Sequence, residues 1–78
     1  MPVIKYDRHA KKRMKEREVS EDEAEAAINN PDFNEPTREG RTNAFKFMNS
    51  RYLRVTYKEE SDSILVVTVT IRKKPFRG

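Results

Sequence analysis

The sequence predicts an α+β domain in which an N-terminal helical hairpin packs on an antiparallel sheet of three to four strands. Two observations lead to this prediction. Apolar residues recur at the helical period across residues 8–29, whereas they alternate with a period of two from residue 41 onward. The chain has 78 residues, which suffices for one compact core but not for two. We therefore treat residues 1–78 as a single domain.

The first predicted helix covers Arg8–Arg17 and follows Asp7, whose carboxylate can cap the free amides of the first turn. At about 100° per residue, Ala10 and Met14 share one side of this helix with three polar residues. These three are His9, Arg13 and Arg17. Because charged groups beside a core need partners, two interpretations stay open: these residues pair with acidic neighbours inside the domain, or they bind phosphate groups.

A second helix is predicted over Glu21–Asn29. Ser20 and Glu23 have the spacing of a capping box, in which each residue binds the backbone amide of the other. An Asn-Pro pair at residues 30–31 ends the helix, because proline cannot continue it. Since only a few residues separate the two helices, they are expected to fold back as a hairpin.

The connection after the second helix is predicted to be irregular. Residues 31–40 contain two prolines and a glycine and are expected to form a loop, with Phe33 as its anchor to the core. At the other end of the chain, Val3–Tyr6 can add an edge strand, but four residues are too few for periodicity to decide. The expected number of strands is therefore three to four.

Three strands are predicted over residues 41–48, 52–57 and 64–71, with polar turns at residues 49–51 and 58–63. Consecutive strands with short turns favour an antiparallel meander. In the last strand, strict alternation would place four residues on one face, namely Leu65, Val67, Val69 and Ile71.

Composition excludes several classes of chemistry. The chain has no cysteine and one histidine, so we expect no disulfide, no metal site and no cofactor. Its two glycines are too few for a phosphate-cradling loop. No apolar run reaches the roughly 18 residues of a membrane span, and the N-terminus lacks the apolar segment of a signal peptide. We therefore expect a cytoplasmic protein without a membrane partner.

The charge is unevenly distributed. The net charge of +4 arises from +5 in residues 1–17, −6 in 18–32, +2 in 33–60 and +3 in 61–78. A basic surface suits a polyanion, because cations that neutralise phosphates release counterions. RNA is therefore the expected partner, although many solvated helices have similar charge patterns. The acidic second helix offers an alternative, a protein-binding surface.

RNA cleavage by the RNA's own 2′-hydroxyl needs a proton acceptor and donor and cations that stabilise the phosphorane, but it needs no metal. His9 can act as acid or base near neutrality, and Arg13 and Arg17 can hold a phosphate. Other cations can extend this groove: Arg51, Arg54, Arg72, Lys73, Lys74 and Arg77. Tyr52 and Tyr57 can stack on bases, but Tyr57 shares its strand face with apolar residues, which favours a place in the core.

One motif resembles a known family. The run His9-Ala10-x-x-Arg13-Met14-x-x-Arg17 is followed by Val-Ser, an acidic helix ending in Asn-Pro, and strands finishing on Val-Thr-Val. This arrangement resembles a family of small uncharacterised bacterial and archaeal domains that is grouped with the RelE, ParE and BrnT toxins. The similarity covers nearly the whole chain, and its motif is concentrated in residues 9–31.

The resemblance implies an RNA-cleaving toxin of the mRNA interferase type, which acts on RNA, in some cases on the ribosome, and is neutralised by an antitoxin protein. It adds Arg72, at the end of the last strand, to His9 and Arg13 as a candidate catalytic residue. Phe76 stands where such toxins would place a tyrosine, so a hydroxyl donor is missing there. The alternative is a non-catalytic module that binds nucleic acid or protein. The sequence leaves the oligomeric state open.

Overall fold

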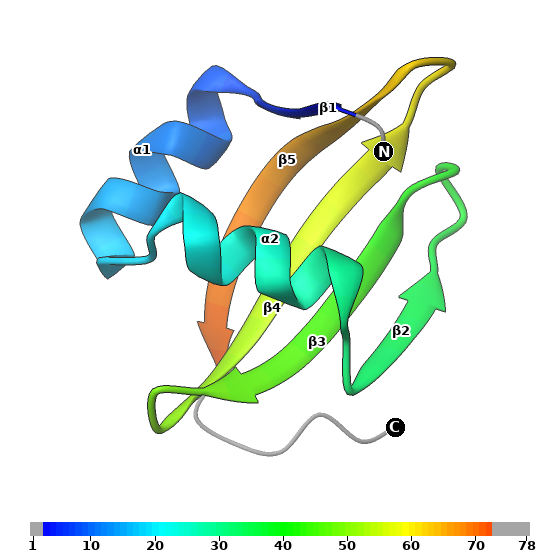
Figure 1. Ribbon diagram of the computed structural model, residues 1–78. Helices are drawn as coiled ribbons and strands as arrows, with labels where there is room; N and C mark the ends of the chain where they lie inside the picture. Colours follow the sequence, from blue (N-terminus) through cyan, green and yellow to red (C-terminus); the bar gives the residue numbers. More distant parts are fainter. Residues whose placement is uncertain (1–2, 73–78) are drawn as a thin grey trace.

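The computed structural model describes residues 3–72, which form a five-stranded sheet and two helices (Figure 1). The elements in chain order are β1 (Val3–Tyr6), α1 (Arg8–Arg17), α2 (Glu21–Asn29), β2 (Phe33–Pro36), β3 (Thr42–Met48), β4 (Arg51–Glu59) and β5 (Ser63–Arg72). The strand order across the sheet is β1-β5-β4-β3-β2. Both helices contribute to a single core on one side of this sheet.

The predicted architecture is wrong in two respects. The sheet has five strands and is mixed rather than antiparallel, because β1 precedes the helices and pairs in parallel with β5. The segment predicted as a loop contains β2, which pairs antiparallel with β3. Only β3, β4 and β5 form the predicted antiparallel meander. Short edge strands are defined by the partner they join, so their own four residues carry almost no periodic signal.

Both predicted helices are confirmed with their predicted bounds. The Asp7 carboxylate accepts a hydrogen bond from the His9 amide, 3.2 Å away, and thereby caps α1. In α2 the capping box is complete: the Ser20 hydroxyl accepts from the Glu23 amide, and the Glu23 carboxylate accepts from the Ser20 amide. Local capping chemistry thus fixes where each helix starts, which is why sequence alone located them.

Asp32 attaches β2 to the sheet. Its amide donates to the Phe45 carbonyl, and its carboxylate accepts from the Phe47 amide, with both bonds 2.8 Å long. The chain leaving α2 is therefore held against β3 just before β2 begins. Phe33 is not the predicted core anchor; it remains 46% exposed. Neither bond to Asp32 could be read from local sequence, since its partners lie more than ten residues away.

A β-bulge changes the faces of β5. Thr56 pairs with Thr68, but the next residue, Tyr57, pairs with Val66, so Val67 has no partner on β4. The extra residue reverses the alternation within the strand. The core side of β5 therefore holds Ile64, Val66, Val69 and Ile71. The predicted set was right for its last two members and wrong for Leu65 and Val67.

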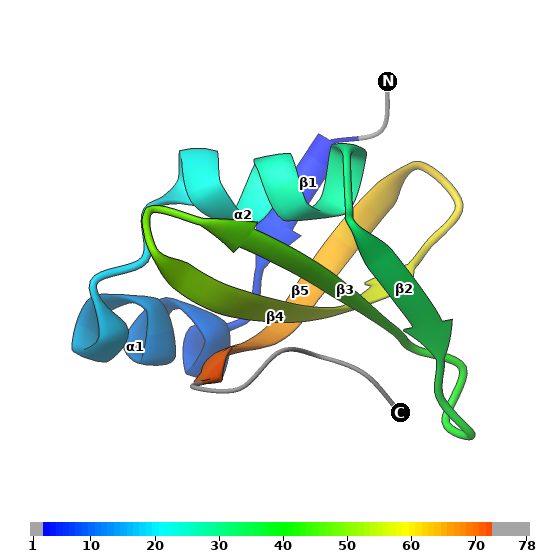
Figure 2. The same ribbon diagram turned by 90° about the horizontal axis from the view of Figure 1, so that it is seen from below.

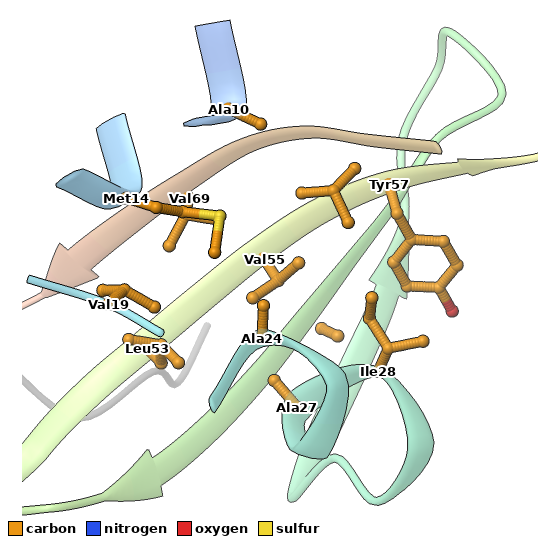
Figure 3. Close-up of a cluster of buried hydrophobic side chains, with 12 residues drawn as sticks. Ala10, Met14, Val19, Ala24, Ala27, Ile28, Leu53, Val55, Tyr57 and Val69 are labelled. Atoms are coloured by element: carbon orange, nitrogen blue, oxygen red, sulfur yellow. The ribbon is translucent and has the colours of Figure 1, made fainter. Parts of the chain in front are cut away.

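The core lies between the helices and the sheet (Figure 3). Its fully buried side chains include Leu53, Val55, Val66 and Val69 from the two central strands. The helices contribute small residues at the contact, such as Ala24 and Ala27 from α2, which allow the backbones to approach closely. The two helices do not pack on each other as the predicted hairpin: α2 packs across β3 and β4, whereas α1 packs against β5 (Figure 1).

Candidate nucleic-acid interface

The side of the sheet away from the core has a different character. In β4, Leu53 and Val55 point into the core, so Tyr52, Arg54 and Thr56 point to the opposite side. We call this opposite side the helix-free face, because both helices of residues 3–72 pack into the core on the other side (Figure 2). Residues paired across neighbouring strands point the same way, so the register defines rows of side chains across this face.

Two adjacent rows combine aromatic rings with a guanidinium group. The first row, from β2 to β5, consists of Phe33, Phe45, Arg54 and Thr70. The second row, from β3 to β5, consists of Phe47, Tyr52 and Arg72. Positions two residues apart on a strand are separated by about 7 Å, so the two rows are immediate neighbours. Each row runs from aromatic residues to an arginine.

The aromatic rings pack in pairs. The Phe33 and Phe45 centroids are 5.6 Å apart, and those of Phe47 and Tyr52 are 4.7 Å apart. Phe45 is almost completely buried, whereas Phe47 is 49% exposed, similar to Phe33. Tilted pairs of this kind are favourable and hold each ring in place. Two large apolar rings thus remain in contact with solvent although they are well anchored.

The two arginines lie beside these rings. The Cζ atom of Arg72 is 5.9 Å from the Phe45 ring centroid, a cation–π contact. Arg54 Nη2 donates to the Thr70 hydroxyl across 3.4 Å, a long hydrogen bond. Arg54 Nε is buried and has no hydrogen-bond partner within residues 3–72. A buried donor of a charged group without an acceptor is unfavourable.

The charged residues of the helix-free face are mainly positive. Thr56 donates to the Asn43 amide oxygen over 2.6 Å, which closes the row next to the aromatic ones. Along strands β1 to β5, the alternation places four cations on this face and one carboxylate, that of Glu35. The four cations are Lys5, Arg54, Lys58 and Arg72. Their charge suits a polyanion.

Arg51, which the sequence predicts to bind RNA, makes several hydrogen bonds within the fold. Its Nη1 donates to the Arg17 carbonyl over 2.8 Å, and its Nη2 lies 2.9 Å from Glu23 Oε2 and 3.1 Å from the Glu18 carbonyl. The side-chain amide of Asn49 donates to the same carboxylate over 2.7 Å. Arg51 therefore ties the β3–β4 hairpin to the end of α1 and the start of α2.

This network also sets the ionisation of Glu23. Burial alone would raise the pKa of its carboxyl group. The hydrogen bonds from the Ser20 amide, Asn49 and Arg51, together with the charge of Arg51, outweigh burial and place the pKa below the ordinary value. Glu23 is therefore ionised at neutral pH and fully hydrogen-bonded.

The other predicted site residues are scattered. His9 and Arg13 are exposed on α1, and Arg13 Nη1 pairs with Glu16 at 3.3 Å. Arg17 also lies near Glu16, at 3.8 Å. No hydrogen bond or ion pair in residues 3–72 joins these three to Arg72. Lys73, Lys74 and Arg77 fall outside the described residues.

Sequence reasoning left Tyr52 open, favoured the core for Tyr57 and missed two phenylalanines. Tyr57 belongs to the core, where burial raises the pKa of its hydroxyl. Tyr52 lies on the helix-free face. Phe33 and Phe47, the exposed rings, were not candidates. The signal for Phe47 is the alternation of β3, where Phe45 and Phe47 are in phase with Arg54 and out of phase with the apolar residues of β4. Phe33 lies on β2 and has no such signal.

Two features, a metal-binding cluster and a membrane-spanning helix, are not found in the described residues. Within residues 3–72, no three histidine or acidic side chains converge where a metal ion could be held. Neither of the two helices in that range is long and apolar enough to cross a membrane. The helix-free face is therefore the feature that remains to be explained.

Fold and face together define a two-layer α+β domain that presents an aromatic and basic sheet surface. Residues 6–71 match the family described as domain of unknown function (DUF4258), and the chain belongs to this family. No curated protein and no solved structure matches the chain. The family description assigns no function, so any functional conclusion must come from the residues.

Proposed function

We propose that the domain binds single-stranded RNA on its helix-free face. The observation that supports this most is the pair of adjacent rows in which aromatic rings lead to Arg54 and Arg72. Proteins that bind single strands combine aromatic side chains, on which bases stack, with cations that neutralise the phosphates. The stability of the core requires neither aromatic rings nor cations on the helix-free face.

The unpartnered Nε of Arg54 adds a second argument. It is buried next to the aromatic row, and within residues 3–72 its guanidinium makes a single long hydrogen bond, to Thr70. A phosphate oxygen would supply the missing acceptor with a charge-assisted bond. The unpaired Nε is unfavourable in the free protein, and RNA binding would remove this cost.

RNA rather than DNA is proposed because of the resemblance to RelE, ParE and BrnT toxins, which also makes messenger RNA on the ribosome a specific target. Cleavage is a further step of the same proposal and has less support. It requires a proton acceptor near the phosphate, and the chain's single histidine, His9, lies on α1 rather than on a strand of the face. A non-catalytic binding domain is therefore the form of the proposal that the geometry favours.

Binding can be tested by titrating a fluorescent single-stranded RNA at several salt concentrations. If about four phosphates are engaged, the logarithm of affinity should fall with the logarithm of salt with a slope of roughly −3. Arg54→Gln and Arg72→Gln should each weaken binding about tenfold. Arg8→Gln, on the exposed start of α1, removes the same charge and should have little effect. Equal losses in all three variants, or binding that ignores salt, would contradict this interface.

Cleavage and toxicity need their own test. Incubating the purified protein with RNA, and inducing it in growing cells, should produce cut RNA and arrested growth if the domain is a toxin. His9→Gln should then restore growth, because its imidazole would be the acid or base. Normal growth with intact RNA, combined with retained RNA affinity, would leave the binding domain and exclude the ribonuclease.

A further inference from the structure

The exposed rings of Phe33 and Phe47 have a defined spacing. Phe33 opposes Phe45 across β2 and β3, and Phe47 follows Phe45 by two residues on β3. Phe33 and Phe47 are therefore diagonal neighbours on one face, about 7–8 Å apart at the backbone. Each is supported from one side by a second ring, Phe45 or Tyr52.

This spacing selects a particular arrangement of bases. Bases that remain stacked in a nucleic-acid strand are separated by about 3.4 Å. Two bases that each lie on one of these rings would be about twice as far apart, so they could not stack on one another. The face thus fits two adjacent nucleotides whose bases have been spread apart, which a duplex cannot offer.

The cations complete the arrangement. Arg72 belongs to the same row as Phe47 but lies over Phe45, in the row of Phe33. Its guanidinium therefore spans the two rows, close to the line along which the phosphate between two such nucleotides would run. Arg54, next to Phe45 on β4, provides a second donor group with its unsatisfied Nε.

We infer that the helix-free face is a platform for two neighbouring unpaired bases, one on Phe33 and one on Phe47, with the connecting phosphate held by Arg72 and Arg54. This inference rests on the proposed RNA binding and specifies its ligand. It predicts that affinity depends on two consecutive bases as well as on charge. The sequence alone, with few clearly exposed aromatic residues, predicts binding governed by charge.

The test compares ring removal in the protein with base removal in the RNA. Phe33→Leu and Phe47→Leu keep apolar bulk but remove the ring, and each should lower the affinity for a single-stranded hexanucleotide about tenfold. The salt slope should not change. Val3→Ala, at an even more exposed apolar residue on the β1 end of the same face, is the control and should bind normally.

The complementary experiment changes the RNA rather than the protein. A hexanucleotide of equal charge that lacks all six bases should bind the original chain about as weakly as the normal RNA binds a variant that carries both Phe33→Leu and Phe47→Leu. With that abasic RNA, Phe33→Leu and Phe47→Leu should cause no further loss. A fully paired hairpin of equal charge should bind weakly.

The outcomes separate the two claims. If no RNA binds at any salt concentration, the proposed function fails. If RNA binds but neither the leucine variants nor the abasic sites weaken it, charge alone carries binding and the two-base platform is overturned. If the leucine variants instead convert a dimer into a monomer in sedimentation, the rings belong to an interface between copies, which also overturns it.

Discussion

The two faces of the sheet are made from the same strands but differ in the burial and the charge of their side chains. Toward the helices, β4 presents Leu53 and Val55, which are fully buried against small residues of α2. On the opposite side it presents Tyr52 and Arg54, which join rings and cations of the neighbouring strands. A single alternating strand therefore contributes both to the core and to the proposed binding surface.

This difference separates stability from function. Burial of apolar area stabilises the fold by roughly 25 cal/mol per Å², so the helix-covered face accounts for most of the stability. The helix-free face contains exposed rings and an unsatisfied donor, neither of which a fold needs. Substitutions on the two faces should accordingly change different observables, and the following predictions are ordered by their expected effect.

Truncation on the helix-covered face should cause the largest loss of stability. Leu53→Ala removes a fully buried side chain and leaves a cavity, so the free energy of unfolding should fall by about 3 kcal/mol. Urea denaturation followed by circular dichroism measures this. A loss below about 1 kcal/mol would mean that this face is not the principal core.

The Arg51 network should come next. Arg51→Gln breaks its pair with the buried Glu23 carboxylate and its bonds to the end of α1, which should lower the free energy of unfolding by about 2 kcal/mol. RNA affinity should not change at temperatures where the variant is folded. A specific loss of RNA binding without loss of stability would return Arg51 to the binding surface.

The same network predicts a pH dependence. Because the pKa of Glu23 is lowered by folding, its contribution to stability is present above the ordinary value of 4.5 and is lost as the pH falls through the lower folded pKa. Acidification from pH 5 to pH 3 should thus destabilise the original chain more than Glu23→Gln. Parallel curves for the two proteins in urea titrations at each pH would show that this carboxylate is not stabilised as described.

On the helix-free face, substitution of Arg54 should lower RNA affinity without lowering stability. Arg54→Leu removes a donor that is buried without a partner, so the free energy of unfolding should stay unchanged or rise by up to about 1 kcal/mol. RNA affinity should fall at the same time. Thermal melts beside RNA titrations test both effects, and a variant less stable by 2 kcal/mol would show that Arg54 serves the fold.

Arg13 should have the smallest effect on stability. Its pair with Glu16 joins two half-exposed side chains three residues apart, so Arg13→Gln should change the free energy of unfolding by less than about 0.5 kcal/mol. The sequence also allows a pair between Arg13 and an acidic neighbour elsewhere in the domain, but Arg51 occupies the Glu23 carboxylate. A loss of more than 1 kcal/mol in urea denaturation would point to a partner inside the fold.

Local signals explain what could be predicted of the fold. Asp7, Ser20 and Glu23 fixed the starts of both helices, because capping depends on residues close in sequence. The parallel pairing of β1 with β5 joins segments about sixty residues apart, and four-residue strands carry no signal of it. The bulge at Val67 was equally invisible, since an apolar run reads the same with or without one extra residue.

The candidate site was predicted only in part. Arg54 and Arg72 were named as cations of the binding surface, and the register places them in adjacent rows. Phe33 was assigned to the core because a single aromatic residue in a polar loop usually anchors it, and no local pattern reveals that the loop is a strand. His9 and Arg13 were predicted from their spacing on one side of a helix. They lie on α1, whereas the aromatic rows lie on strands of the sheet.

The most direct test of the proposed interface is an NMR titration of the isotopically labelled chain with a single-stranded RNA hexanucleotide. If the helix-free face binds RNA, the amide and side-chain signals of β3, β4 and β5 residues on that face should shift, with Phe47, Tyr52 and Arg54 changing most. Signals of α2 and of the buried core should stay in place. Shifts centred on α1, or confined to α2 with the sheet unaffected, would contradict the assignment of binding to the helix-free face.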